Sequence, residues 1–201
     1  VIIDYFEKLF QNNPENKKIE TFLIKKYSCA PFDKWNVRIE DTGDCNIGTR
    51  LFQLRHLLQN EDYFFANYSD SVSTIDINES MLTIKGTPYV ASIASVKPSH
   101  YYHWLNYDNT EVDDRNKFIV KSIENSAKLS HRINGGYMCL SSDIFKYLNY
   151  GEELVEQPFQ RLAQERRLVC YQTNSYWRSI DTYKDLQEAE TELGDLSYDG
   201  K

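Results

Sequence analysis

Tyr63-Phe-Phe-Ala66, followed by Asn67-Tyr-Ser-Asp70, is the stretch that decides the fold of this 201-residue chain. Its first four residues form an unbroken apolar run, which is typical of a strand buried on both faces of a parallel sheet. The polar residues that follow end the strand. Because ligands of open α/β sheets bind beyond the carboxyl ends of the strands, Asp70 lies where a functional carboxylate is expected.

Strand and helix patterns alternate along the rest of the chain. Trp35–Glu40 alternates apolar and polar residues as half-buried strands do, whereas Leu51–Leu58 places leucines at helical spacing. This alternation predicts an α/β fold with helices on both sides of a mostly parallel sheet. The other expected strands are 19–27, 89–96, 118–123, 133–140 and 168–171. The other expected elements are helices at 1–10, 144–148 (capped by Ser142 or Asp143), 159–165 (opened by Pro158) and 182–193, a hairpin or excursion at 100–114 and a connection at 177–181.

The composition limits the class of protein. The net charge of −7, from 23 basic and 30 acidic residues, argues against nucleic acid as the main partner, because phosphate contacts need a basic face. No apolar run reaches the ~18 residues of a membrane span, and no signal-peptide pattern opens the chain. We therefore expect a cytoplasmic protein without a membrane partner. The length predicts one domain, which we place at 1–193, before a polar and flexible tail at 194–201.

The chain begins with Val1 inside a helical pattern that places Ile2, Phe6 and Leu9 on one face. Natural chains rarely begin within a helix, so we expect that a preceding piece is missing together with the first strands of the sheet. A solvent-open cleft or an exposed sheet edge near Asp70 is then expected.

Two aspartates are candidates for a metal site. Asp70 can hold Mg²⁺, which prefers oxygen ligands and takes one or two carboxylates plus substrate phosphates. The alternative is a plain turn residue between two serines. Asp181 precedes an expected helix, and either Asp181 or Thr182 could cap it, since Thr182-Tyr-Lys-Asp185 is similar to a capping box. The local pattern does not decide between these hypotheses.

Five blocks extend the pattern over most of the chain: Trp35-Asn-Val-Arg-Ile-Glu-Asp-Thr-Gly-Asp44, Tyr68-Ser-Asp-Ser-Val72 with Ile75-Asp-Ile77, Ile133-Asn-Gly-Gly136, Leu162-Ala-Gln164 and Tyr176-Trp-Arg-Ser-Ile-Asp-Thr182. In this order and at these spacings they resemble the sugar-1-phosphate nucleotidyltransferases, and among them the glucose-1-phosphate cytidylyltransferases. The likeness runs from about Val1 to about Glu190. It implies a Rossmann-like, glycosyltransferase-A-type fold, and a reaction of CTP with a sugar 1-phosphate that gives a CDP-sugar and pyrophosphate.

The resemblance also implies roles for single residues. Asp70 and Asp181 match the two aspartates with which the family holds one Mg²⁺. Arg50 matches an arginine near the nucleotide. The residues that match contacts to the sugar are Glu124, Asn134, Gly135 and Trp177. The partners implied are CTP, a small phosphorylated substrate and further copies of the same chain in a homo-oligomer.

Several positions depart from the family pattern. The glycine-rich phosphate loop has no counterpart, since Gly48-Thr-Arg-Leu51 follows the 35–44 block instead of preceding it. Ser69 and Ser71 replace two glycines around Asp70, and Asn125 replaces a lysine expected to pair with the sugar phosphate. We expect a cytidylyltransferase-like enzyme acting on a sugar 1-phosphate or a related small phosphate. A catalytically inactive homologue is the alternative, and a glycosyltransferase that uses a nucleotide sugar is a third hypothesis with less support.

Overall fold

The computed structural model describes residues 19–21, 24–29, 32–98, 103–107, 119–125 and 131–194. Contacts divide the chain into two compact units, Val1–Asn46 and Ile47–Lys201, which are described separately. The helix expected at 1–10 lies outside the described residues, as does the tail expected at 194–201 apart from Gly194. The single domain expected over 1–193 stays a prediction.

The first unit contains a three-stranded antiparallel sheet in the order β1-β2-β3. Its strands are β1 (Ile19–Thr21), β2 (Ile24–Cys29) and β3 (Phe32–Glu40). β3 confirms the strand expected at 35–40 and extends it. The single strand expected at 19–27 is wrong, because the chain reverses between β1 and β2. That reversal gives the central strand β2 a backbone partner on each side.

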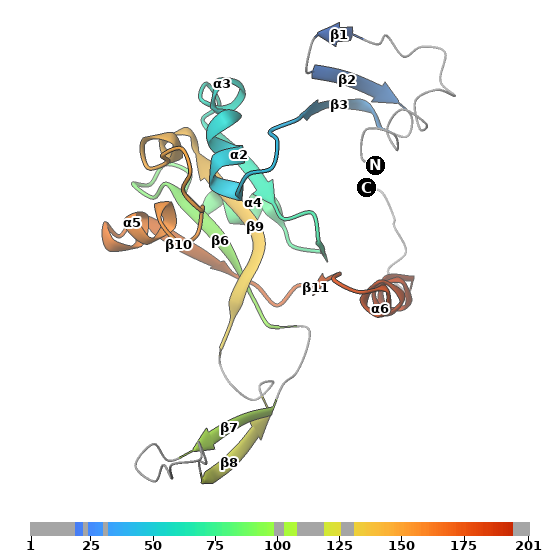
Figure 1. Ribbon diagram of the computed structural model, residues 1–201, viewed down its shortest axis with the longest axis vertical. Helices are drawn as coiled ribbons and strands as arrows, with labels where there is room; N and C mark the ends of the chain where they lie inside the picture. The colour runs from blue at the N-terminus through green and yellow to red at the C-terminus, as the bar shows by residue number, and fades with distance from the viewer. Residues whose placement is uncertain are drawn as a thin grey trace. The chain divides into compact units, whose positions relative to one another are not determined.

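The second unit is built on a four-stranded mixed sheet in the order β10-β6-β9-β4 (Figure 1). Its strands are β4 (Tyr63–Asn67), β6 (Ala91–Val96), β9 (Ile133–Ser141) and β10 (Leu168–Gln172). β10 pairs parallel to β6, whereas β9 runs antiparallel to both β6 and β4. Three of the four strands therefore point in one direction. The expected mixed α/β fold, with a sheet flanked by helices, is confirmed.

The helices differ from the sequence-based expectation at three places, the first of which is a short helix at Ile77–Leu82 that was not expected. The helix expected over 51–58 is broken at Leu54, because Leu57 N–H donates to the carbonyl of Leu54 three residues earlier instead of four. The segment expected as a capped helix at 144–148 is a 3₁₀ helix whose N-cap residue is Ser141. The helices are α2 (Ile47–Gln53), α3 (Arg55–Leu58), α4 (Ile77–Leu82), η2 (Ser142–Lys146), α5 (Pro158–Gln164) and α6 (Tyr183–Gly194).

The hydrophobic core of this unit packs η2 and α5 against the sheet. Phe64 and Leu140 lie opposite each other on neighbouring strands, and the Phe64 ring stacks on Phe145 of η2 with centroids 5.9 Å apart. Each such side chain contributes about 1.5–3 kcal/mol when fully buried. The other core residues are Leu51, Val90, Ala91, Met138, Ile144, Leu148, Leu154, Phe159 and Leu162.

β4 is not buried on both faces, which corrects the expectation from its apolar run. Its Phe64 is in the core, but the next residue, Phe65, is 42% exposed. A cavity of about 240 Å³ lies beside it, between β4, β9 and the start of α4. β4 is also the edge strand of the described sheet. A continuous apolar run therefore overstates the burial of a strand whose one face is incompletely covered.

Two short antiparallel strand pairs lie outside the central sheet. β7 (His103–Tyr107) pairs with β8 (Val120–Asn125), so the hairpin or excursion expected at 100–114 supplies only one strand of this pair, and the strand expected at 118–123 supplies the other. β5 (Ser71–Ser73) pairs with β11 (Trp177–Ser179), where the sequence indicated only a connection. No helix among the described residues is both long and apolar enough to cross a membrane.

An ion pair fastens the turn before α5 to that helix. Arg161 Nη1 donates to Glu152 Oε1 over 2.9 Å, and Arg161 Nη2 also donates to the carbonyl of Tyr147. The amide of Asn149 adds hydrogen bonds to the same carboxylate. Hydrogen bonding by Arg161, followed by that of Asn149, lowers the pKa of Glu152 from 4.5 to about 2.

We predict that Glu152→Gln destabilises the fold in a pH-dependent manner. A carboxylate whose pKa is lower in the folded state stabilises fully above its unfolded value of 4.5, and this contribution is lost as the pH falls toward 2. Urea unfolding should therefore show a constant deficit for the variant between about pH 5 and 7, and a shrinking deficit below that range. Glu156→Gln, an exposed neighbour, is the control. A deficit that did not change on acidification would contradict the assignment.

Candidate functional site

The β5–β11 ladder brings the two candidate aspartates into the same neighbourhood. Ser71 lies opposite Ser179 at the end of this ladder. One step further, the N–H of Ile180 donates to the carbonyl of Asp70 over 2.7 Å. Asp181, the next residue, is therefore held beside Asp70 although the two are far apart in the sequence. The backbone contact is between Ile180 and Asp70, and the distance between the carboxylates of Asp70 and Asp181 stays a prediction.

Asp181 is not the cap of the helix that follows it. Thr182 N–H and Thr182 Oγ1 donate to Asp185 Oδ2 over 2.8 and 2.7 Å, and Asp185 N–H donates back to Thr182 Oγ1 over 3.2 Å. This reciprocal pair is the capping box that the sequence indicated. Because Thr182 and Asp185 cap α6, the carboxylate of Asp181 is left for another role.

Both carboxylates are suited to holding a divalent cation. Asp70 and Asp181 are exposed, and within the described part of the chain neither carboxylate makes a hydrogen bond or an ion pair. Among the described residues no group of three or more His, Cys, Asp or Glu side chains could hold a metal ion. Two carboxylates are nevertheless sufficient for Mg²⁺, which completes its octahedron with water and substrate phosphates. By chemical type the two residues are ligands that Mg²⁺ accepts, and a shared metal site at Asp70 and Asp181 stays a prediction.

The expected sugar-contacting residues gather at the start of β9. The indole Nε1 of Trp177 donates to the carbonyl of Gly135 over 2.6 Å, which ties β11 to β9. Asn134 Oδ1 accepts from the N–H of Gly136 over 2.9 Å. A side chain at Gly135 would lie only 2.9 Å from a methyl group of Val96. The structure thus brings Asn134, Gly135 and Trp177 together, as the sequence predicted.

Tyr68 is a residue of this site that the sequence analysis missed. Its N–H donates to the carbonyl of Gly136 over 3.0 Å, which ties the residue to the glycine pair of β9. Gly136 has φ +74°, and a Cβ there would meet the Tyr68 ring at 2.8 Å, so both its conformation and its neighbour require glycine. Burial raises the pKa of Tyr68, with added repulsion from the charges of Glu153 and Asp70.

Tyr137 is a second residue that sequence reasoning did not single out. Its hydroxyl donates to the carbonyl of Ser71 over 3.2 Å, which fixes the β5 end of the ladder to β9. The only signal in the sequence was the aromatic residue directly after the glycine pair. Tyr68 and Tyr137 together attach the Asp70 turn to the Asn134-Gly135-Gly136 segment from two sides.

β11 is in turn anchored to α6 by a buried arginine. Arg178 Nη1 donates to Glu188 over 2.7 Å and Nη2 to Glu192 over 2.6 Å. Burial opposes the charge of Arg178, but these hydrogen bonds raise the pKa of its guanidinium. The side chains of Glu188 and Glu192 are 40% and 43% exposed, so solvent screens these ion pairs in part, and the hydrogen-bond geometry does most to fix the guanidinium. Arg178 therefore holds in place the strand that carries Trp177 and leads to Asp181.

Two expected site residues are not joined to this cluster by the contacts described. Glu124 lies on β8, where its Oε1 accepts from Asn106 Nδ2 over 2.7 Å and from Ser122 Oγ over 3.2 Å. Arg50 is exposed on α2, whose neighbouring Thr49 accepts a hydrogen bond from the N–H of Gly151. The roles of Glu124 and Arg50 stay predictions.

No model of a known protein family matches the chain. It is similar to curated proteins named glucose-1-phosphate cytidylyltransferase from Salmonella typhi, with 26% identity over 155 residues, and probable glucose-1-phosphate cytidylyltransferase from Bacillus subtilis, with 24% identity over 159 residues. These alignments cover 76% and 78% of this chain. The chain spans 58–59% of the length of these relatives.

Two solved structures share the fold of this chain. One is a putative glucose-1-phosphate thymidylyltransferase from Bacillus anthracis in complex with sucrose, with a TM-score of 0.56, 17% identity, and coverage of 79% of this chain and 65% of that one. Another is HddC from Yersinia pseudotuberculosis, with a TM-score of 0.54, 16% identity, and coverage of 96% and 73%. This chain is therefore similar in sequence to proteins named glucose-1-phosphate cytidylyltransferase, and it shares its mixed α/β fold with these solved structures.

Proposed function

We propose that this chain acts in a metal-dependent nucleotidyltransferase that transfers a cytidylyl group from CTP to a sugar 1-phosphate or a related small phosphate and releases pyrophosphate. The observation that carries the proposal is the hydrogen bond between Ile180 N–H and the Asp70 carbonyl, because it assembles the two acids. The names of the curated relatives support the same activity. They give no support to a catalytically inactive homologue.

The chemistry is a single in-line displacement. An oxygen of the acceptor phosphate attacks the α-phosphorus of CTP, and the bond from that phosphorus to the oxygen bridging the β-phosphate breaks. Both reactants are anions, so catalysis consists mainly of positioning and charge stabilisation. Asp70 and Asp181 would hold Mg²⁺, which would supply that charge stabilisation. No covalent intermediate with the protein is required.

The acceptor would lie beside Asn134, Gly135 and Trp177. The indole of Trp177 is fixed by its bond to the Gly135 carbonyl, so it presents a rigid aromatic wall. The side chain of Asn134 is likewise fixed, because its Oδ1 accepts from the N–H of Gly136. This arrangement suits a sugar. The fixed amide of Asn134 can hydrogen-bond the sugar hydroxyls, and the fixed ring of Trp177 can pack against the apolar face of the sugar ring.

The first prediction from this proposal concerns metal binding. Asp70→Asn and Asp181→Asn should each weaken Mn²⁺ binding, used as a paramagnetic stand-in for Mg²⁺, by at least about tenfold, since each removes one of two charged oxygen ligands. Electron paramagnetic resonance of free Mn²⁺ measures this directly, with and without CTP. Asp181→Asn should leave the unfolding free energy within about 0.5 kcal/mol, because Thr182 caps α6.

Glu190→Gln, an exposed acid on α6, is the matched control and should bind Mn²⁺ as the unaltered chain does. If Asp181→Asn kept full Mn²⁺ affinity, the shared metal site would be wrong. A loss of stability in Asp181→Asn without any loss of Mn²⁺ binding would identify Asp181 as a structural residue only.

The second prediction concerns the acceptor. If Asn125 lies where the family places a lysine toward the sugar phosphate, Asn125→Lys should tighten binding of glucose 1-phosphate. A hydrogen bond to a charged group contributes about 1.5–3 kcal/mol, or roughly 10- to 150-fold in affinity. Calorimetric titration with glucose 1-phosphate in the presence of Mg²⁺ and CTP measures the change.

Val120→Lys provides the control, because it adds the same charge to the same strand, β8, at an exposed position. Equal gains from both substitutions would reveal a non-specific charge effect. No gain from Asn125→Lys would show that the hairpin does not reach the acceptor phosphate, and the metal prediction would still stand.

A further inference from the structure

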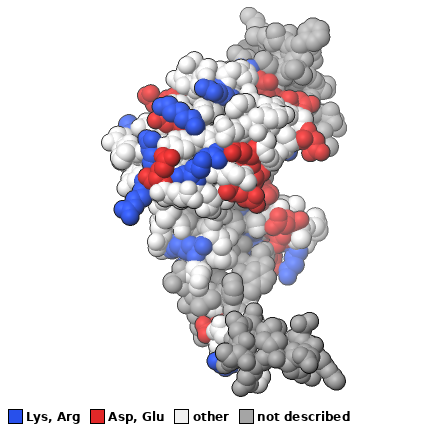
Figure 2. All heavy atoms as spheres, turned by 60° about the vertical axis from the view of Figure 1, so that its left-hand side comes forward, with Lys and Arg blue, Asp and Glu red and all other residues white. Residues whose placement is uncertain are grey.

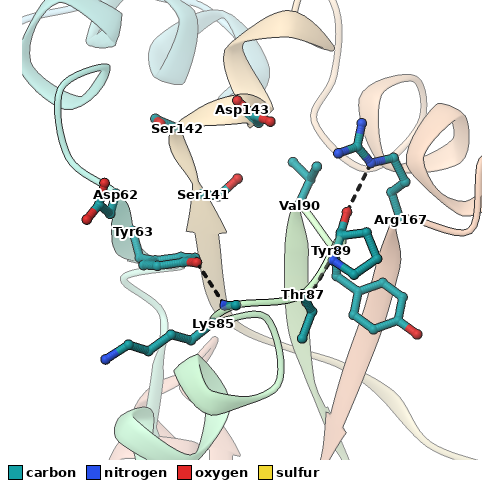
Figure 3. A pocket seen from close by; sticks show the side chains of 12 residues that line it. Asp62, Tyr63, Lys85, Thr87, Tyr89, Val90, Ser141, Ser142, Asp143 and Arg167 are labelled. Carbon is teal, nitrogen blue, oxygen red and sulfur yellow. Dashed lines mark hydrogen bonds between the residues drawn. The ribbon is translucent and has the colours of Figure 1, made fainter.

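A second cavity, of about 520 Å³, lies at one end of the central sheet, whereas Asp70 and Asp181 lie at the other. Figure 3 shows the side chains that line this cavity. It is formed where β4, β6 and β10 begin and β9 ends, with Tyr63, Val90, Ser141 and Arg167 around it. Tyr63 is the first residue of β4, and Asp70 follows the last. At ~3.4 Å per residue, the strand alone separates the two by at least about 13 Å. The cavity is therefore distinct from the proposed catalytic site.

The cavity contains side chains with unused hydrogen-bonding capacity. The carboxylate of Asp62, the ammonium group of Lys85 and the hydroxyls of Ser141 and Ser142 make no hydrogen bond or ion pair within the described part of the chain. The hydroxyl of Tyr63 accepts from the N–H of Gly86 over 3.2 Å and keeps its own proton to donate. Donors and acceptors from three separate segments of the chain thus line the same cavity.

Arg167 is the most firmly positioned of these groups. Its Nε donates to the carbonyl of Pro88 over 3.0 Å, and its Nη1 donates to the hydroxyl of Tyr147 over 2.9 Å. The guanidinium also lies over the Tyr147 ring, 5.8 Å from the centroid. The remaining donors of Arg167 are held at the cavity without a further partner in the described residues. A pre-positioned arginine needs little ordering when a ligand binds.

The charges that line the cavity balance. Lys85 and Arg167 are opposed by Asp62 and Asp143, and Asp143 is also paired with Lys146 at 2.8 Å. Figure 2 likewise shows basic and acidic side chains interspersed, without a large patch of one sign, on the side that it presents. A balanced set favours neither an anion nor a cation. Its mixture of hydrogen-bond donors and acceptors matches ligand groups that can both donate and accept hydrogen bonds. The hydroxyl is the commonest such group.

We propose that this cavity binds a neutral carbohydrate. The volume lies within the range of pockets for small ligands. Hydroxyls of a sugar ring would donate to Asp62 and Asp143 and accept from Arg167 and Ser142. The Tyr63 ring supplies an apolar surface on one wall (Figure 3). The site goes beyond the proposed transfer reaction, and binding there requires neither CTP nor Mg²⁺.

The test is an NMR titration of the full, isotopically labelled chain with glucose, mannose, sucrose and myo-inositol. Amide chemical shifts are measured at each sugar concentration, in the absence of nucleotide and metal. At least one sugar should give saturable shifts at Gly86, Val90 and the 141–143 amides, with a dissociation constant in the millimolar range, roughly 1–20 mM. Asp62→Asn and Ser142→Ala should each weaken this binding about fivefold or more. Asp44→Asn, an exposed acid outside the cavity, should not.

Several outcomes would overturn the proposal. One is no shift at these amides with any of the sugars up to about 50 mM. Another is shifts confined to Asn134, Gly135 and Trp177, which would assign the sugar to the acceptor site. Equal shifts with glycerol at matched hydroxyl concentration would indicate a co-solvent effect, and saturable binding of inorganic phosphate instead would identify an anion site. The spectra of both variants must keep the dispersion of the unaltered chain, which separates lost binding from lost folding.

Discussion

The backbone hydrogen bond from Ile180 to Asp70 is the contact on which the candidate site depends. It continues a ladder of only three residue pairs, so the strands β5 and β11 are too short to be stable alone. Their position comes from side chains instead: Trp177 and Tyr137 bind them to β9, and Arg178 binds β11 to α6. Two acids from distant parts of the chain can meet because these three attachments hold the ladder against the sheet.

The core strands and Asp70 could be predicted because their signals are local. A run such as Tyr63-Phe-Phe-Ala66 shows a strand, and the polar residues after it show where the strand ends. The capping box at Thr182 and Asp185 is equally local and was readable. The prediction that Asp181 lies near Asp70 came from the longer resemblance. The neighbours of Asp181 depend on the pairing of β5 with β11, which local sequence patterns do not reveal.

The parts that were wrong or missed all depend on tertiary neighbours. The burial of Phe65 is set by what covers its face of β4, which no periodicity reveals. The break between α2 and α3 at Leu54 could not be predicted, because the leucines keep helical spacing through it. Tyr68 acts through Gly136, a residue far from it in the sequence, so its role appears only once β4 and β9 are paired. Local pattern thus locates the elements, and contacts between them assign the site.

The mixed sheet explains why one strand, β9, supplies polar groups at both ends of this unit. β9 begins with Asn134 and Gly135 at the acid cluster and ends with Ser141 at the second cavity, because it runs against its neighbours. At the first end, β9 contributes the amide side chain of Asn134 and a glycine backbone that its neighbours approach closely. At the other end, it contributes the hydroxyl of Ser141, which lies beside the amino ends of β4, β6 and β10. The glycine pair at the first end removes side chains where Tyr68 and Val96 crowd the backbone. A single antiparallel strand therefore supplies polar groups to two sites that its own length keeps apart.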